Sequence, residues 1–251
     1  MKILFTICAR KGSKGLKNKN ISEFLGQPIC YYTLSAYDLF KKENGNLDCD
    51  LAVNTDSEEL IKQINKTNHK YTHIKRTPEL AGDTTGKVDV IIDTYKKMNK
   101  EYDYVIDLDL TSPLRTSKDI KGTLEALLNN KEADLSFSVT TSRRSPYFNQ
   151  VKKQENGYYT PIEYTGATAR QQVPKVYDMN ASIYVYKPEF LLKGVKIFDG
   201  RCCAYEMKDT AILDIDNPED KELMEILAEY FYKTDNDMAK VKNNIKNIKV
   251  N

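Results

Sequence analysis

A basic, glycine-containing segment near the N-terminus has the composition of a phosphate-binding loop. Residues 8–20 contain one arginine, four lysines and two glycines, directly after the apolar run 3–7. Glycines let backbone N–H groups approach a polyphosphate without a Cβ in the way, and Arg10, Lys14 and Lys19 can neutralise its charge. The two glycines are three residues apart, so neither GxxxxGK[ST] nor GxGxxG is present. The segment predicts a phosphate site of another type; the alternative is a solvated basic loop.

Two pairs of aspartates, Asp107 with Asp109 and Asp214 with Asp216, have the spacing that places both side chains on one face of a strand. Such carboxylates repel each other unless a positive charge lies beside them, and a divalent cation is the natural candidate. Mg²⁺ binds a few carboxylates together with substrate phosphate oxygens, so the pairs predict a nucleotidyl-transfer site. For Asp107 we expect structural hydrogen bonding. Taken singly, each pair could also be a helix cap, a turn or surface acids.

Several other functions are disfavoured by the composition. The only histidines, His69 and His73, lie together in a strand entry, and no GxSxG surrounds a serine, so nucleophilic-triad chemistry is unsupported. A net charge of +2 argues against a surface built for nucleic acid. Five cysteines without a CxxC pair predict reduced thiols. We find neither an export signal nor an apolar stretch of membrane-spanning length, and we expect a cytoplasmic protein with no membrane partner.

The chain alternates between strand and helix patterns, which predicts an α/β fold with a mostly parallel, doubly wound sheet. The expected strands are 3–7, 50–56, 71–75, 104–110 and 181–186. The expected helices are 29–40, one beginning at Ser57, 88–98, 118–128 and 218–232. Open α/β sheets bind ligands at the carboxyl ends of their strands. We therefore expect the basic loop to meet three later segments at that edge, namely 76–84, 107–115 and 214–216.

The predicted domain spans residues 1–234 and carries one insertion. From about 142 to 178 the alternation gives way to aromatic and polar residues with several prolines and glycines, which indicates an inserted arm. Residues 235–251 are rich in Lys and Asn and are expected to form a mobile or weakly helical tail.

Five motifs in the same order resemble those of the acylneuraminate cytidylyltransferases, the CMP-sialic acid synthetases, and the resemblance covers about residues 3–229. The motifs are Ala-Arg-x-Gly-Ser-Lys-Gly-x-x-x-Lys-Asn, Arg-x-x-Glu-Leu-Ala-x-Asp-Thr, Thr-Ser-Pro-Leu-Arg-Thr, Ala-Arg-Gln-Gln-x-Pro and Asp-Ile-Asp. The resemblance implies a nucleotide-diphospho-sugar transferase-like sheet, CTP as co-substrate and Mg²⁺ as cofactor. It also implies a homodimer in which the inserted dimerisation arm contributes to the neighbour's active site.

The same resemblance implies roles for individual residues. The catalytic residues would be Arg10, Lys19 and Asp216, and the metal would bind Asp214 and Asp216. The nucleotide-binding residues would be Arg10, Gly12, Ser13, Lys14, Lys19, Asn20 and Arg76. The sugar-binding residues would be Asp109, Thr111, Ser112, Arg170, Gln171, Asp178 and Asn180.

Departures from the family pattern bear on the sugar. Asp109 stands where sialate enzymes have a sugar-facing glutamine, and Asp178 stands where some have an arginine. Two carboxylates in place of an amide and a cation remove hydrogen-bond donors and add acceptors, so the preferred sugar should differ. The chain looks most like the CMP-legionaminic acid synthetase branch. Related enzymes for the eight-carbon acid Kdo place a metal-binding aspartate on the corresponding strand, so a metal contact for Asp109 stays open.

The implied reaction is attack of the anomeric hydroxyl of a nonulosonic acid on the α-phosphorus of CTP, giving a CMP-sugar and pyrophosphate. Activation of N-acetylneuraminate or Kdo with CTP is an alternative within the same enzyme class. A module that binds nucleic acid through the basic loop is a different class, and so is a catalytically silent relative that only dimerises.

Overall fold

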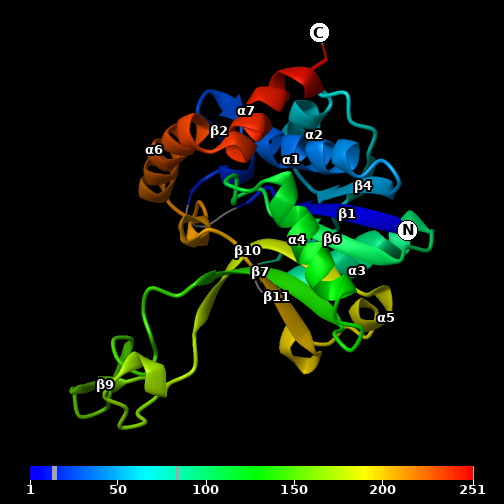
Figure 1. Ribbon diagram of the computed structural model, residues 1–251. Coiled ribbons are helices and arrows are strands. Elements are labelled where there is room, and N and C mark those ends of the chain that lie inside the picture. Colours follow the sequence, from blue (N-terminus) through cyan, green and yellow to red (C-terminus); the bar gives the residue numbers. More distant parts are fainter. Residues whose placement is uncertain (13–15, 83–84, 251) are drawn as a thin grey trace.

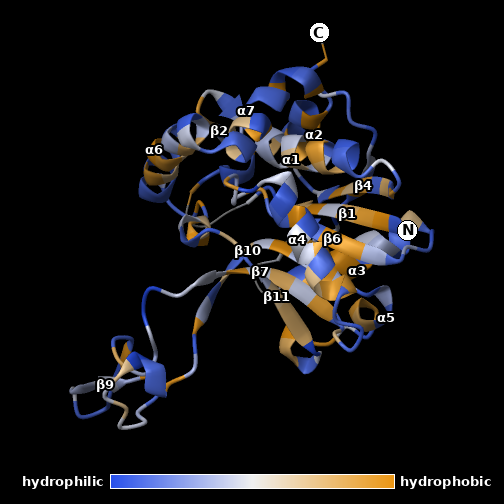
Figure 2. Cartoon of the chain, in the orientation of Figure 1, coloured by the Kyte–Doolittle hydropathy of each residue, from blue (hydrophilic) through white to orange (hydrophobic). Residues whose placement is uncertain are grey.

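The protein is built around one twisted sheet of seven strands (Figure 1). The computed structural model describes residues 1–12, 16–82 and 85–250. The strands of this sheet are β1 (Lys2–Ala9), β4 (Asp48–Thr55), β5 (Thr72–Lys75), β6 (Tyr104–Leu108), β7 (Leu135–Thr141), β10 (Tyr177–Tyr186) and β11 (Cys202–Glu206). Figure 2 shows these strands as mostly apolar, whereas the arm is mostly hydrophilic to neutral.

The strand order β11-β7-β10-β6-β1-β4-β5 confirms the mostly parallel, doubly wound fold. β10 runs antiparallel to both β6 and β7, and the other neighbouring pairs are parallel. The chain runs from β1 outward to β4 and β5, and then returns to place β6 on the other side of β1. This reversal of direction opens a crevice at the carboxyl ends of β1, β4 and β6, which is where ligands bind in such sheets.

Helices cover both faces of the sheet. The seven α-helices of the described chain are α1 (Cys30–Glu43), α2 (Glu58–Ile64), α3 (Lys87–Met98), α4 (Ser117–Leu128), α5 (Pro188–Leu191), α6 (Pro218–Thr234) and α7 (Asn236–Ile248). The helices α1, α2, α4, α6 and α7 share one core with the sheet. On the opposite face, α3 and α5 pack in a second core. No helix among the described residues is long and apolar enough to span a membrane.

Side-chain caps fix the starts of α2, α4 and α6. Ser57 Oγ accepts from Leu60 N at the start of α2, as its position in the sequence predicts. Thr116 and Asp119 form a reciprocal capping box at α4. Asn217 caps α6 in the same way, so the turn that holds Asp214 and Asp216 leads into a fixed helix start.

The inserted segment leaves the sheet after β7 and returns in β10. It contains the hairpin of β8 (Val151–Lys153) and β9 (Tyr159–Pro161) and projects away from the body (Figure 1). Tyr158, Tyr159 and Tyr164 on the arm are exposed. The shorter elements are β2 (Glu23–Phe24), β3 (Gln27–Pro28), η1 (Lys19–Ile21), η2 (Glu79–Ala81), η3 (Arg170–Gln172), η4 (Ile197–Asp199) and η5 (Asp209–Ile212).

The expectation of a mobile or weakly helical tail is wrong. Residues 236–248 form α7, whose start is capped by Asp235 Oδ1, which accepts from the backbone N–H groups of Asp237 and Met238. Met238, Val241, Ile245 and Ile248 on this helix are buried in the core shared with α1. Their spacing of three to four residues forms an apolar face, which the abundance of Lys and Asn obscured.

Two strands of the sheet were not among the predictions. β7 reads Leu-Ser-Phe-Ser-Val-Thr-Thr, and β11 reads Cys-Cys-Ala-Tyr-Glu. Serine, threonine and alanine weaken the apolar signal in both, although β7 is almost entirely buried. β10 begins at Tyr177, so the arm ends slightly before the predicted boundary at 178.

Candidate active site

A cavity of about 280 Å³ lies at the crevice, and both charged clusters border it. Its lining residues are Cys8, Arg10, Lys19, Asn20, Arg76, Leu80, Gly82, Thr85, Lys87, Val90, Asp109, Thr111 and Asp214. The predicted meeting of the basic loop with the segments 76–84, 107–115 and 214–216 at one sheet edge is therefore confirmed for the described residues. Cationic and anionic side chains lining one cavity suit a ligand with phosphates and a bound cation.

Contacts with neighbouring elements hold the described part of the basic loop in place. The backbone N–H of Lys11 donates to Asp56 Oδ1 at 2.7 Å, just beyond the end of β4. Asn20 Nδ2 donates to the Arg10 carbonyl at 3.0 Å, which ties the two ends of the loop together. A Cβ on Gly12 would meet nothing within 4 Å, so open space surrounds that residue. The predicted nucleotide-binding residues Ser13 and Lys14 lie outside the described residues.

Arg76 reaches the cavity from the end of β5 with its guanidinium held by β4. Its Nε donates to Asn54 Oδ1 and its Nη2 to the Asn54 carbonyl, both at 3.0 Å. Asn54 Nδ2 in turn donates to Thr94 Oγ1 on α3 at 2.9 Å. Burial lowers the pKa of Arg76, an effect opposed by the charges of Cys8, Asp56 and Asp107. Asn54, which orients this cation, has no motif in the sequence to reveal it.

The acidic wall is formed by Asp214, which lines the cavity, together with Asp216 beside it in the turn before α6. Lys19 Nζ forms an ion pair of 2.7 Å with Asp216 Oδ1, which joins the basic loop to this turn. Burial, followed by the charge of Asp216, raises the pKa of Asp214. Among residues 1–12, 16–82 and 85–250, no group of three or more His, Cys, Asp or Glu side chains could hold a metal ion. A cation here would need other ligands besides this pair.

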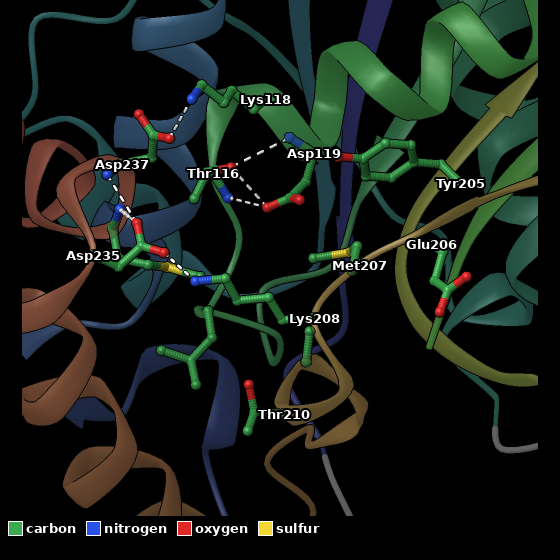
Figure 3. A pocket seen from close by; sticks show the side chains of 13 residues that line it. Thr116, Lys118, Asp119, Tyr205, Glu206, Met207, Lys208, Thr210, Asp235 and Asp237 are labelled. Atoms are coloured by element: carbon green, nitrogen blue, oxygen red, sulfur yellow. Dashed lines mark hydrogen bonds and ion pairs between the residues drawn. The ribbon is translucent and has the colours of Figure 1, made fainter. Parts of the chain in front are cut away.

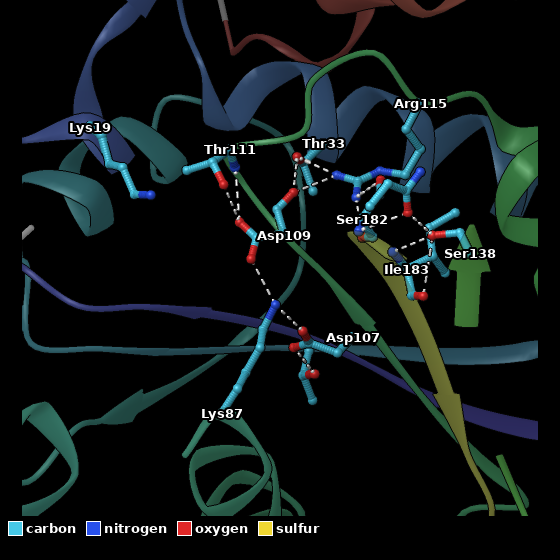
Figure 4. A network of polar contacts seen from close by, with 12 residues as sticks. Lys19, Thr33, Lys87, Asp107, Asp109, Thr111, Arg115, Ser138, Ser182 and Ile183 are labelled. Carbon is cyan, nitrogen blue, oxygen red and sulfur yellow. Dashed lines mark hydrogen bonds and ion pairs between the residues drawn. The ribbon is translucent and has the colours of Figure 1, made fainter. Parts of the chain in front are cut away.

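The positive charge beside the Asp107–Asp109 pair is the ammonium of Lys87, which bridges both carboxylates (Figure 4). Lys87 Nζ lies 2.8 Å from Asp107 Oδ2 and 2.7 Å from Asp109 Oδ2. Asp107 is fully buried and accepts from Thr6 Oγ1 at 2.7 Å, so its structural role is confirmed. Although burial opposes ionisation of Asp109, Lys87 and hydrogen bonds from Thr111 outweigh it and hold its pKa well below the usual range.

Arg115 clamps the loop that carries Asp109, a role that the sequence did not reveal. The side chain is buried, and burial lowers its pKa to about 10. Its Nη1 donates to the Ser182 carbonyl at 2.6 Å, and its Nη2 donates to the Asp109 carbonyl and to Thr33 Oγ1, each at 2.7 Å (Figure 4). These bonds tie the end of β6 to β10 and α1, so the backbone of Asp109 is fixed as well as its side chain.

The predicted sugar-binding residues do not all meet at the cavity. Asp109 and Thr111 line it, whereas Ser112 and Asn180 are buried and are absent from its lining. Asn180 Oδ1 accepts from Ser138 Oγ at 2.6 Å inside the sheet, so Asn180 is a core hydrogen-bonding residue in this structure. Asp178 lies on β10 opposite Thr140, away from the cavity lining.

Arg170 and Gln171 lie on the arm, in η3, and neither belongs to the cavity of their own chain. Arg170 instead lines a second cavity within the arm, together with Arg143 and Arg144.

Two other features of the described chain are poorer candidates for catalysis. The Cys8 thiol lines the cavity, but burial and the nearby Asp107 carboxylate raise its pKa, so it stays a weak nucleophile. A further cavity of about 230 Å³ lies between α4, β11 and the α6–α7 junction (Figure 3). Its lysines are already paired, Lys118 with Asp237 and Lys208 with Asp235, which leaves little uncompensated charge for an anionic ligand.

Comparisons with known proteins agree with this geometry. A family profile described as "Cytidylyltransferase" matches residues 4–243. The chain is 37% identical to the post-translational flagellin modification protein B of Campylobacter coli and 36% identical to the CMP-N,N'-diacetyllegionaminic acid synthase of Campylobacter jejuni. Each match covers 90% of this chain and 94% of the relative.

Two further proteins are more distant. An N-acylneuraminate cytidylyltransferase of Streptococcus agalactiae is 31% identical over 88% of this chain, which corresponds to 52% of that longer protein. A solved CMP:2-keto-3-deoxy-manno-octonic acid synthetase complexed with CTP has the same fold, with a TM-score of 0.65 at 16% identity over 92% of this chain and 99% of its own. With a profile match over most of its length, the chain is a nucleotidyltransferase that belongs to the cytidylyltransferase family.

Proposed function

We propose that the protein transfers CMP from CTP to the anomeric hydroxyl of a nonulosonic acid of the legionaminic type. The observation that carries the proposal is one cavity lined both by the cations Arg10, Lys19 and Arg76 and by the carboxylates Asp109 and Asp214. The relatives of similar length support the substrate class, since one of them is named a CMP-N,N'-diacetyllegionaminic acid synthase. The structural likeness to a CTP-complexed synthetase supports CTP as the donor.

The chain's own residues act mainly by binding and charge compensation. In the reaction the anomeric oxygen forms a bond to the α-phosphorus. The bond between the α-phosphorus and the oxygen that bridges it to the β-phosphorus breaks, and the hydroxyl proton is released. Negative charge builds up on the departing pyrophosphate, and Arg10 and Lys19, which line the cavity, would neutralise it. Arg76, held by Asn54, supplies a fixed cation on the nucleotide side. No histidine lines the cavity, so no imidazole base is available there among the described residues.

The donor set of the acidic wall fits Mg²⁺. Asp214 and Asp216 are close enough for the charge of one to raise the pKa of the other, and such a pair is stabilised by a hard cation with oxygen ligands. Asp214 and Asp216 would hold the ion, with phosphate oxygens and waters completing its shell. When bound, Mg²⁺ would neutralise the phosphates and lower the pKa of a coordinated hydroxyl.

The arm supports a homodimer in which each subunit completes its neighbour's site. The segment 142–176 carries six basic and two acidic residues and projects from the body with exposed tyrosines. Exposed aromatic side chains of this kind typically mark protein–protein contacts. Arg170 would then bind the sugar carboxylate across the subunit boundary, which accounts for its absence from the cavity of its own chain.

The test of the function is a substrate panel. The purified protein is incubated with CTP, Mg²⁺ and separate nonulosonic acids, including di-N-acetyllegionaminic acid, N-acetylneuraminate and Kdo, and the CMP adduct is detected by mass spectrometry. We expect the highest kcat/KM with the legionaminic acid. A preference for N-acetylneuraminate or Kdo would correct the substrate, and no adduct with any sugar acid would refute the proposed function.

A further inference from the structure

Lys87 is the charged residue of the cavity that lies outside every motif considered above. It is the first residue of α3, and its ammonium bridges the two aspartates that end β6 (Figure 4). The side chain is 32% exposed at the cavity, and its Nζ lies 5.6 Å from the centre of the Tyr184 ring. Lys87 is therefore both tied to the sheet and accessible to a ligand.

The position of Lys87 works against helix stability. The N-terminus of a helix carries a partial positive charge, so a cation at the first position is unfavourable there. The carboxylates of Asp107 and Asp109 offset this effect, and Asp107 is fully buried with Thr6 on its other oxygen. A residue whose charge is unfavourable for its own helix, and which lies at the wall of a cavity, is a candidate for a functional role.

The consequence of the bridge is that Asp109 has a fixed orientation. Its Oδ1 accepts from the N–H and the Oγ1 of Thr111, at 3.0 and 2.8 Å, and its Oδ2 accepts from Lys87 at 2.7 Å. Three of the roughly four lone-pair sites of the carboxylate are thus in use, and placing both oxygens on a cation held by Asp214 and Asp216 would break these bonds. The side chain is nonetheless 27% exposed at the cavity, so the remaining site can still accept a hydrogen bond from a ligand.

We propose that Lys87 is a positioning residue for sugar recognition, which holds Asp109 as an oriented acceptor at the cavity wall and keeps it from serving as a metal ligand. An ammonium has three N–H donors; Lys87 donates one to Asp109 and lies 2.8 Å from Asp107, so at least one N–H remains beside the Asp109 carboxylate. The pair thus presents one donor and one acceptor to the hydroxyl or acylamino groups of a sugar acid. This inference rests on the function proposed above.

A charge-matched double variant separates positioning from simple neutralisation. Lys87→Met with Asp107→Asn removes the bridge but leaves the local net charge unchanged, because one cation and one carboxylate are lost together. We expect its KM for the sugar to rise by about tenfold or more while its KM for CTP stays within about twofold. The single variant Asp107→Asn keeps the Lys87–Asp109 pair, and Asp107 does not line the cavity, so this control should retain the wild-type KM for the sugar.

Three outcomes of this experiment would overturn the proposal. A wild-type sugar KM in the double variant would mean that Lys87 only neutralises Asp107. An increase confined to the KM for CTP would assign Lys87 to the nucleotide. An equally raised sugar KM in Asp107→Asn alone would mean that the effect comes from the buried aspartate.

The metal part of the proposal is tested without any sugar, so it stands apart from the proposed function. Binding of Mn²⁺ in the presence of CTP is measured by electron paramagnetic resonance. We expect Asp109→Asn to bind Mn²⁺ as the wild type does, and Asp214→Asn to bind it at least about tenfold more weakly. Weaker Mn²⁺ binding by Asp109→Asn would make Asp109 a metal ligand. If the wild-type protein activates no sugar acid, the proposed function fails, and this measurement still decides the role of Asp109.

Discussion

At the scale of single residues, the site consists of opposite charges that later segments bring to the end of β1. Lys19 pairs with Asp216, Lys87 joins Asp107 to Asp109, and Arg76 is held by Asn54. Each of these three cations therefore has a defined partner in the described structure. Fixed charges of this kind stabilise a transition state without having to reorganise during the reaction.

Asp216 provides the residue-level prediction. Replacing Asp216 with Ala removes a carboxylate from the acidic wall and the partner of Lys19. We expect CMP-sugar formation to fall by at least about hundredfold, because charge compensation at the reacting phosphate is lost, while CTP binding survives in part. Steady-state kinetics and calorimetric CTP titration measure the two effects. Glu222→Ala, an exposed acid on α6, is the matched control, and full activity of Asp216→Ala would contradict the role.

The sequence predicted the residues at the charged ends of the strands better than the residues that orient them. Arg10, Lys19, Arg76 and Asp214 lie where the motifs placed them, because loops after parallel strands meet at one edge. Asn54 and Arg115 were missed because their roles depend on partners far away in the chain. No local pattern encodes such contacts.

At the scale of elements, α7 is the largest departure from expectation. Its polar composition suggested a mobile tail, yet its apolar residues recur on one face and bury against α1. Ser35 Oγ on α1 also donates to the Val241 carbonyl at 2.6 Å. The helix is therefore part of the domain, and the boundary at 234 marks only the break between α6 and α7.

The second prediction concerns the stability that α7 contributes. Ile245 is 4% exposed in the shared core, so Ile245→Ala should lower the free energy of unfolding by about 2–5 kcal/mol through lost burial and a cavity. Urea denaturation followed by circular dichroism measures this change. Lys246→Ala, one residue further on the exposed face, should stay within about 0.5 kcal/mol of wild type. Equal stability of all three proteins would mean that α7 is not docked.

The third prediction follows from His69, which packs against Tyr37 of α1 with ring centres 5.8 Å apart. Burial lowers the pKa of His69, outweighing the opposing charge of Asp38. In the unfolded chain His69 has its ordinary pKa of about 6.5, so it binds a proton at a higher pH than it does in the folded protein. The free energy of unfolding therefore falls as the pH falls below about 6.5. The slope is limited to about 1.4 kcal/mol per pH unit for one group.

Denaturation at pH values between about 7 and about 5 isolates this effect, because only histidines have ordinary pKa values in that range. We expect His69→Gln to flatten the loss of stability in this window. His73→Gln replaces the other histidine of the chain, so a comparison of the two variants assigns the loss to one histidine. An unchanged slope in His69→Gln would show that another group causes the loss.

At the scale of the whole molecule, the body holds the candidate cavity and the arm carries a cationic cluster away from it. Arg143, Arg144 and Arg170 line a cavity within the arm, which projects from the sheet (Figure 1). A homodimer in which each arm reaches the neighbouring body would bring the two together. The sequence predicted the arm from its change in composition, but a single chain cannot show which body it serves.

Subunit mixing provides the fourth prediction. Asp216→Ala disables the body and Arg170→Ala disables the arm, so each homodimer should be nearly inactive. If the arm acts across subunits, each mixed dimer has one intact site, and about a quarter of wild-type activity should return after the variants are mixed and exchanged. No recovery, with dimers verified by light scattering, would place Arg170 in its own subunit's site or outside any site.

The most direct measurement of the central claim is a crystal structure of the protein with CTP and Mg²⁺. The account predicts the triphosphate between Arg10 and Lys19, the cytidine on the side of Arg76, and the metal on Asp214 and Asp216. CTP bound elsewhere, for example in the cavity between α4 and the α6–α7 junction, or a metal held by Asp109 in place of that pair, would contradict it.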